Sequence, residues 1–226
     1  MHDETLTNAV THRGAALKDA ALITPDANDA AEGVSVRYAY DPAKQWFVLR
    51  ATYGRAPKAA EYIARDGTEV YIPRKRILAF RETEKGGRLQ RVLTMVPVLS
   101  NFLFVYATAE KTDRYVRDTP ALPYVSYYYD HFRKTGAGTN PPLTVGYREM
   151  MNFINFMNVS NDNVFLADPR YVRYKTDDRV RIICGDFQGI EGRVVRYAGQ
   201  QRVALTLHGL CTVLTAYIPT AFIEKI

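Results

Sequence analysis

The apolar residues of this chain come in short runs that glycine and proline interrupt. The runs are rich in aromatic and β-branched residues, which favour strands, and the longest of them spans only a few residues. This pattern is typical of a protein built from many short strands, and it predicts no helix that crosses a membrane. Hydrophobic residues make up 47% of the 226 residues, which is enough for a packed core.

Charge is distributed unevenly along the chain, whose formal net charge is +6. Residues 44–130 carry a net +6 and residues 131–175 a net +3, whereas residues 1–43 carry a net −4. Because the first 43 residues are rich in Ala, Asp, Thr and Asn and have no aromatic residue before Tyr38, we expect a flexible arm there. The basic surplus permits a polyanionic partner but does not require one.

Residues 44–132 are expected to form the first folded domain, which begins and ends with a strand and contains two helices. A hairpin turn is expected at Lys85-Gly86-Gly87, between two of the strands. The pattern predicts strands at 45–52, 69–72, 74–84, 88–96, 102–106 and 124–129, and helices that begin near Pro57 and at Ala109. This order indicates an α+β sandwich with mainly antiparallel pairing.

The rest of the chain divides into a linker and a second domain. Residues 133–175 begin with glycine and proline, which is typical of a linker, and an apolar stripe then predicts a helix over 147–158. Residues 176–226 hold short β-branched runs between glycines. Five short strands in about 50 residues predict a small β-barrel.

Two motifs resemble those of a known family. Gly185-x-Phe187-x-Gly189, followed by Ile190 and Gly192 between two apolar runs, resembles the KOW motif. Upstream, the stretches that carry the likeness are Trp46–Ala51 with Gly54, Tyr71-Ile72-Pro73, and Pro97–Val105. They resemble the N-terminal (NGN) domain of NusG-type transcription elongation factors. The resemblance covers about residues 45–226, and it is nearest to specialised paralogues such as the UpxY-type antiterminators and RfaH.

The resemblance implies an NGN-type antiparallel α/β sandwich followed by a small SH3-like KOW β-barrel. It also implies a cytoplasmic bacterial elongation or antitermination factor, of the kind that acts at polysaccharide biosynthesis operons. In this family the NGN domain binds the clamp helices of RNA polymerase. Phe102 and Phe104 match the aromatic residues of that interface and share one face of a strand, and Tyr128 lies on a neighbouring strand. The alternative is that all three are core residues.

The resemblance implies two further partners. Phe187 and Ile190 match exposed loop residues that bind a small-subunit ribosomal protein or the termination factor Rho; the alternative is that Phe187 folds back onto the barrel. DNA near the transcription bubble is expected to contact basic residues around the first helix and the hairpin, since cations neutralise phosphates. These residues are Arg55, Lys58, Arg65, Arg74, Lys75 and Arg76. The alternative is a solvated basic surface.

The sequence does not predict catalysis, a cofactor or a metal site. It has no His or Cys pair at metal-ligand spacing, no glycine-rich nucleotide-binding loop and no acid–base couple. Its two cysteines, Cys184 and Cys211, cannot form a disulfide framework, so we expect buried thiols in a reducing cytosol. No basic segment followed by an apolar one opens the chain, so no secretory signal is expected.

Two other functions stay open at this stage. The chain is compatible with a ribosome-associated or general RNA-binding KOW protein, which would bind naked RNA as tightly as polymerase. It is also compatible with a structural or hydrolytic protein, for which an enclosed pocket with two converging polar groups would be the mark.

Overall fold

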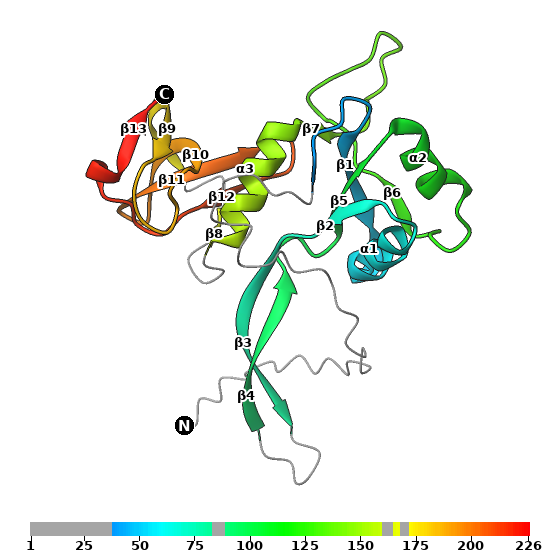
Figure 1. Ribbon diagram of the computed structural model, residues 1–226, viewed down its shortest axis with the longest axis horizontal. Coiled ribbons are helices and arrows are strands. Elements are labelled where there is room, and N and C mark those ends of the chain that lie inside the picture. The colour runs from blue at the N-terminus through cyan, green and yellow to red at the C-terminus, as the bar shows by residue number, and fades with distance from the viewer. Residues whose placement is uncertain (1–37, 83–88, 160–164, 168–171) are drawn as a thin grey trace, which may run out of the picture.

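The computed structural model describes residues 38–82, 89–159, 165–167 and 172–226. The described chain forms a five-stranded sheet, a projecting two-stranded hairpin and a six-stranded sheet (Figure 1). The long helix α3 (Tyr147–Asn158) lies between the five-stranded and the six-stranded sheet. The expected flexible arm lies almost entirely outside the described residues.

The five-stranded sheet, called here the N-terminal sheet, is antiparallel and is centred on β1 (Gln45–Ala51). Its other strands are β2 (Glu69–Tyr71), β5 (Phe102–Ala107), β6 (Val125–Tyr127) and β7 (Thr144–Val145). The order is β2-β5-β1-β6, and β7 also pairs with β1. Four consecutive β1 residues, 46–49, are buried because both faces of the sheet are covered.

One face of the N-terminal sheet packs on α1 (Ala56–Arg65) and α2 (Ala109–Asp113). Small side chains on α1, together with Ile63, let the helix approach the strands closely, and Pro57 suits its first turn. The chain continues from α2 into a π-helical turn at Arg114–Asp118, and a 3₁₀ turn at Thr52–Gly54 joins β1 to α1. This face therefore has a complete core of its own.

The opposite face of the N-terminal sheet packs on α3. The core there is one continuous cluster that includes residues of β1, β5, α3 and the second sheet. The α3 side chains buried in it are Met150, Met151, Phe153, Ile154, Phe156 and Met157. These occupy most of the helix circumference, as expected for a helix with a layer on each side.

The six-stranded sheet, called here the C-terminal sheet, is also antiparallel, in the order β13-β9-β10-β11-β12-β8. Its strands are β8 (Phe165–Leu166), β9 (Arg173–Ile182), β10 (Glu191–Tyr197), β11 (Gln200–Leu207), β12 (Cys211–Leu214) and β13 (Ile223–Lys225). A 3₁₀ turn at Thr220–Phe222 precedes β13. The position of Gly192 on β10 admits no side chain, because a Cβ there would lie 2.5 Å from the Ala204 carbonyl oxygen.

The hairpin consists of β3 (Arg74–Glu82) and β4 (Leu89–Pro97), paired over nine residues each. The Val98 amide donates to the Pro73 carbonyl at 2.8 Å and closes its base. The hairpin projects away from both larger sheets (Figure 1). The hairpin itself is confirmed, while the expected turn at 85–87 lies outside the described residues.

The mixed architecture agrees with the expected α+β class, and the order of elements across residues 44–132 follows the prediction. The helix over 147–158 has the expected bounds. Other elements differ locally: the strand expected at 124–129 covers only Val125–Tyr127, and the helix expected to begin at Ala109 turns π-helical after Asp113. The sequence analysis had not predicted β7, β8 or β13, since two- and three-residue strands carry almost no periodic signal.

Candidate functional site

The three aromatic residues expected to bind polymerase come together on the α3-covered face of the N-terminal sheet. Phe102 and Tyr128 are half-buried and meet edge to face, with ring centroids 5.0 Å apart. Phe104 is fully buried, and its ring lies 5.9 Å from that of Phe153 on α3. In this structure Phe104 is therefore a core residue beneath the helix, and only Phe102 and Tyr128 are partly accessible.

Phe187 and Ile190 lie on the loop between β9 and β10, as the glycine spacing predicted. Gly185 and Gly189 have φ angles of +84° and +87°, and the Gly189 amide donates to the Ile182 carbonyl at 2.7 Å. The expectation that the two apolar side chains stand exposed is wrong for this structure. Phe187 is only 4% exposed because its ring packs against Phe156 of α3, 5.6 Å away.

Helix α3 therefore covers both sets of apolar residues that the sequence singled out. Its Phe153 faces the N-terminal sheet, with ring centroids 6.4 Å from Tyr71 and 5.9 Å from Phe104. Its Phe156 faces the C-terminal sheet. From the sequence this helix was expected to be part of a linker. Apolar residues on more than one side of the helix are the signal that it lies between two layers.

Polar contacts fix α3 to the C-terminal sheet. The Asn152 side chain donates to the Glu191 carbonyl at 2.7 Å and accepts from the Glu191 amide at 3.1 Å. The Glu191 carboxylate pairs with Arg181 at 2.8 Å and with Arg148 of α3 at 3.1 Å. The hydrogen bond from Arg181 and the positive charge of Arg148 hold the pKa of Glu191 below its ordinary value.

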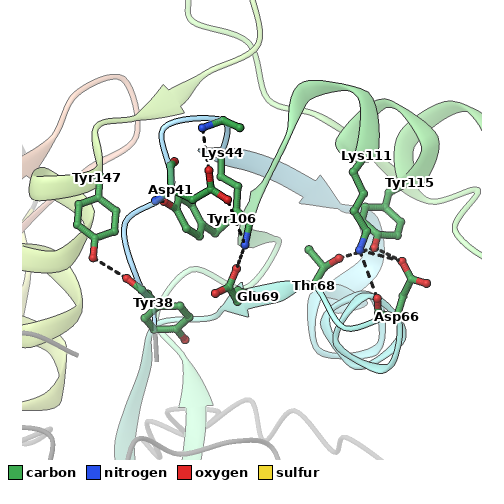
Figure 2. A network of polar contacts seen from close by, with 11 residues as sticks. Tyr38, Asp41, Lys44, Asp66, Thr68, Glu69, Tyr106, Lys111, Tyr115 and Tyr147 are labelled. Carbon is green, nitrogen blue, oxygen red and sulfur yellow. Dashed lines mark hydrogen bonds and ion pairs between the residues drawn. The ribbon is translucent and has the colours of Figure 1, made fainter. Parts of the chain in front are cut away.

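A second polar network fixes the segment before β1 (Figure 2). Tyr147 at the start of α3 donates to the Tyr38 carbonyl, and the Asp41 amide donates to the Tyr106 hydroxyl at 2.8 Å. Lys44 pairs with Glu69 of β2 at 2.9 Å. These contacts join α3, the entry segment and two strands, which anchors the first turn of the helix.

A shallow hollow of about 190 Å³ lies beside α2 and is lined by Asp66 and Tyr115 among others. Tyr115 donates to Asp66 and shares a 2.6 Å hydrogen bond with Thr68, and Lys111 lies 3.5 Å from Asp66 (Figure 2). The Tyr115 hydrogen bond and the Lys111 charge lower the pKa of Asp66, whereas burial raises that of Tyr115 to about 12. Neither group titrates near neutral pH, so the pair is not suited to general acid–base catalysis.

The basic residues expected to contact DNA lie on two separate elements. Around α1, Lys58 is exposed and Arg65 pairs with Glu61. At the hairpin base, Lys75 and Arg76 are exposed, whereas burial lowers the pKa of Arg74. The structure does not bring these cations together on one element.

Arg55 has a distinct setting that the sequence analysis missed. Its guanidinium lies over two aromatic rings, 5.0 Å from the centroid of Tyr124 and 5.8 Å from that of Tyr53. Tyr53 is 89% exposed and has a φ of +57°, which is unusual for a bulky residue. An exposed aromatic ring held in a strained conformation is a candidate binding residue.

The two cysteines differ in their surroundings. Cys211 is half-buried, and burial raises the pKa of its thiol to about 12. Cys184 is exposed, so the expectation of a buried thiol is wrong there. In the parts of the chain that the structure describes, no three His, Cys, Asp or Glu side chains are grouped as a metal site would need.

Residues 44–126 match a family model described as transcription termination factor nusG. A search of curated proteins found no match. The matched residues run from the start of β1 into β6 and include α1, α2 and the hairpin. The match covers 83 of the 226 residues and supports a NusG-type domain over this part of the chain. None of the described helices is long and apolar enough to cross a membrane.

Proposed function

We propose that this protein is a transcription elongation or antitermination factor that binds the clamp helices of RNA polymerase through the α3-covered face of its N-terminal sheet. One observation carries the proposal: the segment that matches the NusG model contains the strand with Phe102 and Phe104. The aromatic side chains at this face offer an apolar contact with an exposed helical partner. The factor acts by favouring the elongating state of polymerase over the paused one, which needs no bond chemistry.

Binding at this face requires α3 to move. Phe104 is fully buried beneath the helix, so a partner that contacts it must replace the contacts made by Phe153. The same movement exposes Phe187, because Phe156 covers it. The C-terminal sheet is then a KOW domain whose loop, with Phe187 and Ile190, recruits a small-subunit ribosomal protein or Rho.

DNA beside the transcription bubble is the proposed second contact. The candidate residues around α1 are Arg55, Lys58 and Arg65, and Arg74, Lys75 and Arg76 are those at the hairpin base. Arg55 next to the exposed ring of Tyr53 combines a cation with an aromatic face, a pairing that suits an unpaired base. We further propose that the factor belongs to the specialised paralogues similar to UpxY and RfaH, which act in the bacterial cytoplasm at polysaccharide operons.

The test is the affinity of the full chain for core RNA polymerase, followed by transcription across a terminator. We expect the double variant F102A/Y128A to lose at least tenfold in affinity and to lose terminator readthrough, since both side chains lie at the face and are not fully buried. The matched control is Tyr62→Ala, which removes a 42%-exposed aromatic residue from α1. Unchanged binding by the double variant, or naked RNA bound as tightly as polymerase, would contradict the proposal.

A further inference from the structure

The two faces of the β3–β4 hairpin differ in chemistry, and one of them is an uncovered apolar surface. Cross-strand pairing puts Leu78 opposite Leu93, Phe80 opposite Arg91 and Arg76 opposite Met95. Partners in an antiparallel pair share a face, and so do residues two apart along a strand. The positions of this face, called here the leucine face, are Arg74, Arg76, Leu78, Phe80, Glu82, Leu89, Arg91, Leu93, Met95 and Pro97.

The leucine face is exposed to an unusual degree for its composition. Leu78 is 53% exposed, and Phe80, Leu89 and Leu93 are 62–63% exposed. None of the described hairpin residues belongs to a core cluster of the protein. The opposite face carries Ala79 and Val92, which are only partly exposed, and Ile77, which is 37% exposed and so less exposed than any leucine of the leucine face. A contiguous group of large exposed apolar side chains on one face marks an interaction surface.

The charged residues of the leucine face indicate what kind of surface a partner would present to it. Three arginines and one glutamate, Glu82, hold the charged positions of this register. Arg76 and Arg91 are exposed, and the Arg91 guanidinium lies 6.0 Å from the centre of the Phe80 ring. Glu82 holds the last position in this register, at the far end from the base. Two exposed cations beside leucine and phenylalanine complement an apolar surface that carboxylates border.

Nucleic acid fits this face less well than protein does. A phosphate backbone is bound by cations and polar groups, whereas the middle of the leucine face is aliphatic and aromatic. The cations at the hairpin base are also divided between the faces, because Lys75 alternates with Arg74 and Arg76. A second copy of this chain would bring like-charged arginines together across a shared two-fold axis.

We propose that the leucine face docks onto an apolar protein surface bordered by carboxylates, and that this surface belongs to RNA polymerase at a place distinct from the clamp-helix contact. The inference rests on the proposed function for the identity of the partner. The hairpin then provides a second binding contact with polymerase. Its two strands gain the covering layer that an isolated two-stranded ribbon lacks.

The first measurement is the affinity of full-length variants for core RNA polymerase. We expect L78T/L93T to lose at least tenfold, since threonine removes the apolar contact but keeps a strand-favouring residue. The matched control is I77T/V92T on the opposite face, which we expect to bind within twofold of the unchanged protein. Equal losses from both pairs, or no loss from L78T/L93T, would overturn the inference.

The second measurement identifies what touches the face. A photo-crosslinking amino acid replaces Leu78, or Ile77 as control, in elongation complexes of polymerase, DNA and RNA. We expect position 78 to crosslink to a polymerase subunit and position 77 not to. Crosslinks from position 78 to DNA, to RNA or to a second copy of the chain would overturn the inference. If F102A/Y128A abolishes binding to polymerase but position 78 gives no crosslink, the hairpin contact alone is overturned. If no variant binds polymerase at all, the proposed function is overturned as well.

Discussion

The α3 interface and the β3–β4 hairpin place apolar side chains in opposite situations. At α3, Phe104 and Phe187 are buried on either side of one helix although both were expected to face a partner. On the hairpin, Leu78 and Phe80 are exposed although the segment was singled out only for its basic residues. The comparison teaches that strand composition identifies apolar faces well but does not tell which of them the rest of the chain covers.

The difference follows from what lies within reach of each face. The α3-covered face of the N-terminal sheet and the β9–β10 loop both meet a helix that follows the N-terminal sheet by only a short connection, so their apolar area is removed from water within the chain. The hairpin extends past both sheets (Figure 1), and none of its described residues belongs to a core cluster with a helix. We therefore expect the α3 interface to contribute to the stability of the free protein and the leucine face to contribute almost nothing.

The largest effect is expected for Phe153→Ala at the α3 interface. Phe153 is fully buried between Tyr71 and Phe104, and removing a buried phenylalanine side chain costs about 3–5 kcal/mol. The measurement is urea unfolding followed by the fluorescence of Trp46, the single tryptophan, which lies in the same core cluster. The control is Phe132→Ala, because Phe132 is 84% exposed and its loss should change stability by less than about 0.5 kcal/mol.

The same variant links stability to binding. If α3 covers a polymerase-binding face, Phe153→Ala should bind core polymerase more tightly under conditions where circular dichroism shows that the strands remain folded. A variant as stable as the unchanged protein would show that α3 is not held by this contact, and the contrast with the hairpin would then disappear.

Local patterns predicted most of the elements because their signals lie within a few residues. The β1 strand and the helix over 147–158 have the expected positions, since aromatic runs and apolar spacing are properties of the segment itself. The burial of Phe104 and Phe187 was stated from the sequence only as an alternative to an exposed position, and β7 and β8 were not expected at all. Each of these features depends on a segment that is distant in sequence, and the composition of a strand does not indicate which of its faces that segment covers.

An intermediate effect is expected for Glu191→Gln, which weakens the polar link between α3 and the C-terminal sheet. Glu191 pairs with Arg148, Arg179 and Arg181, whose side chains are 43–82% exposed, so the loss should be only about 1 kcal/mol at pH 7. Because the pKa of Glu191 is lowered in the fold, its contribution is full above its ordinary pKa and is lost as the pH falls through the lower value.

The measurement for this variant is the urea midpoint at pH 7 and again at pH values below the ordinary glutamate pKa of about 4.3. The difference between the variant and the unchanged protein should shrink as the pH falls. Glu110→Gln, on the exposed first turn of α2, is the control. A difference that stays constant down to low pH would mean that Glu191 acts through its shape and not through its charge.

The smallest effect on stability is expected for L78T/L93T on the leucine face, which should change the free energy of unfolding by less than about 0.5 kcal/mol. Both side chains are more than half exposed, so little apolar area is returned to water when they are removed. The same urea titration with Trp46 fluorescence measures it, beside I77T/V92T. A loss of 2 kcal/mol or more would show that the leucine face is covered within the free protein, and its role would then match that of the α3 interface. A near-zero change together with a large loss of polymerase affinity would separate the two regions completely, one holding the fold together and the other reserved for a partner.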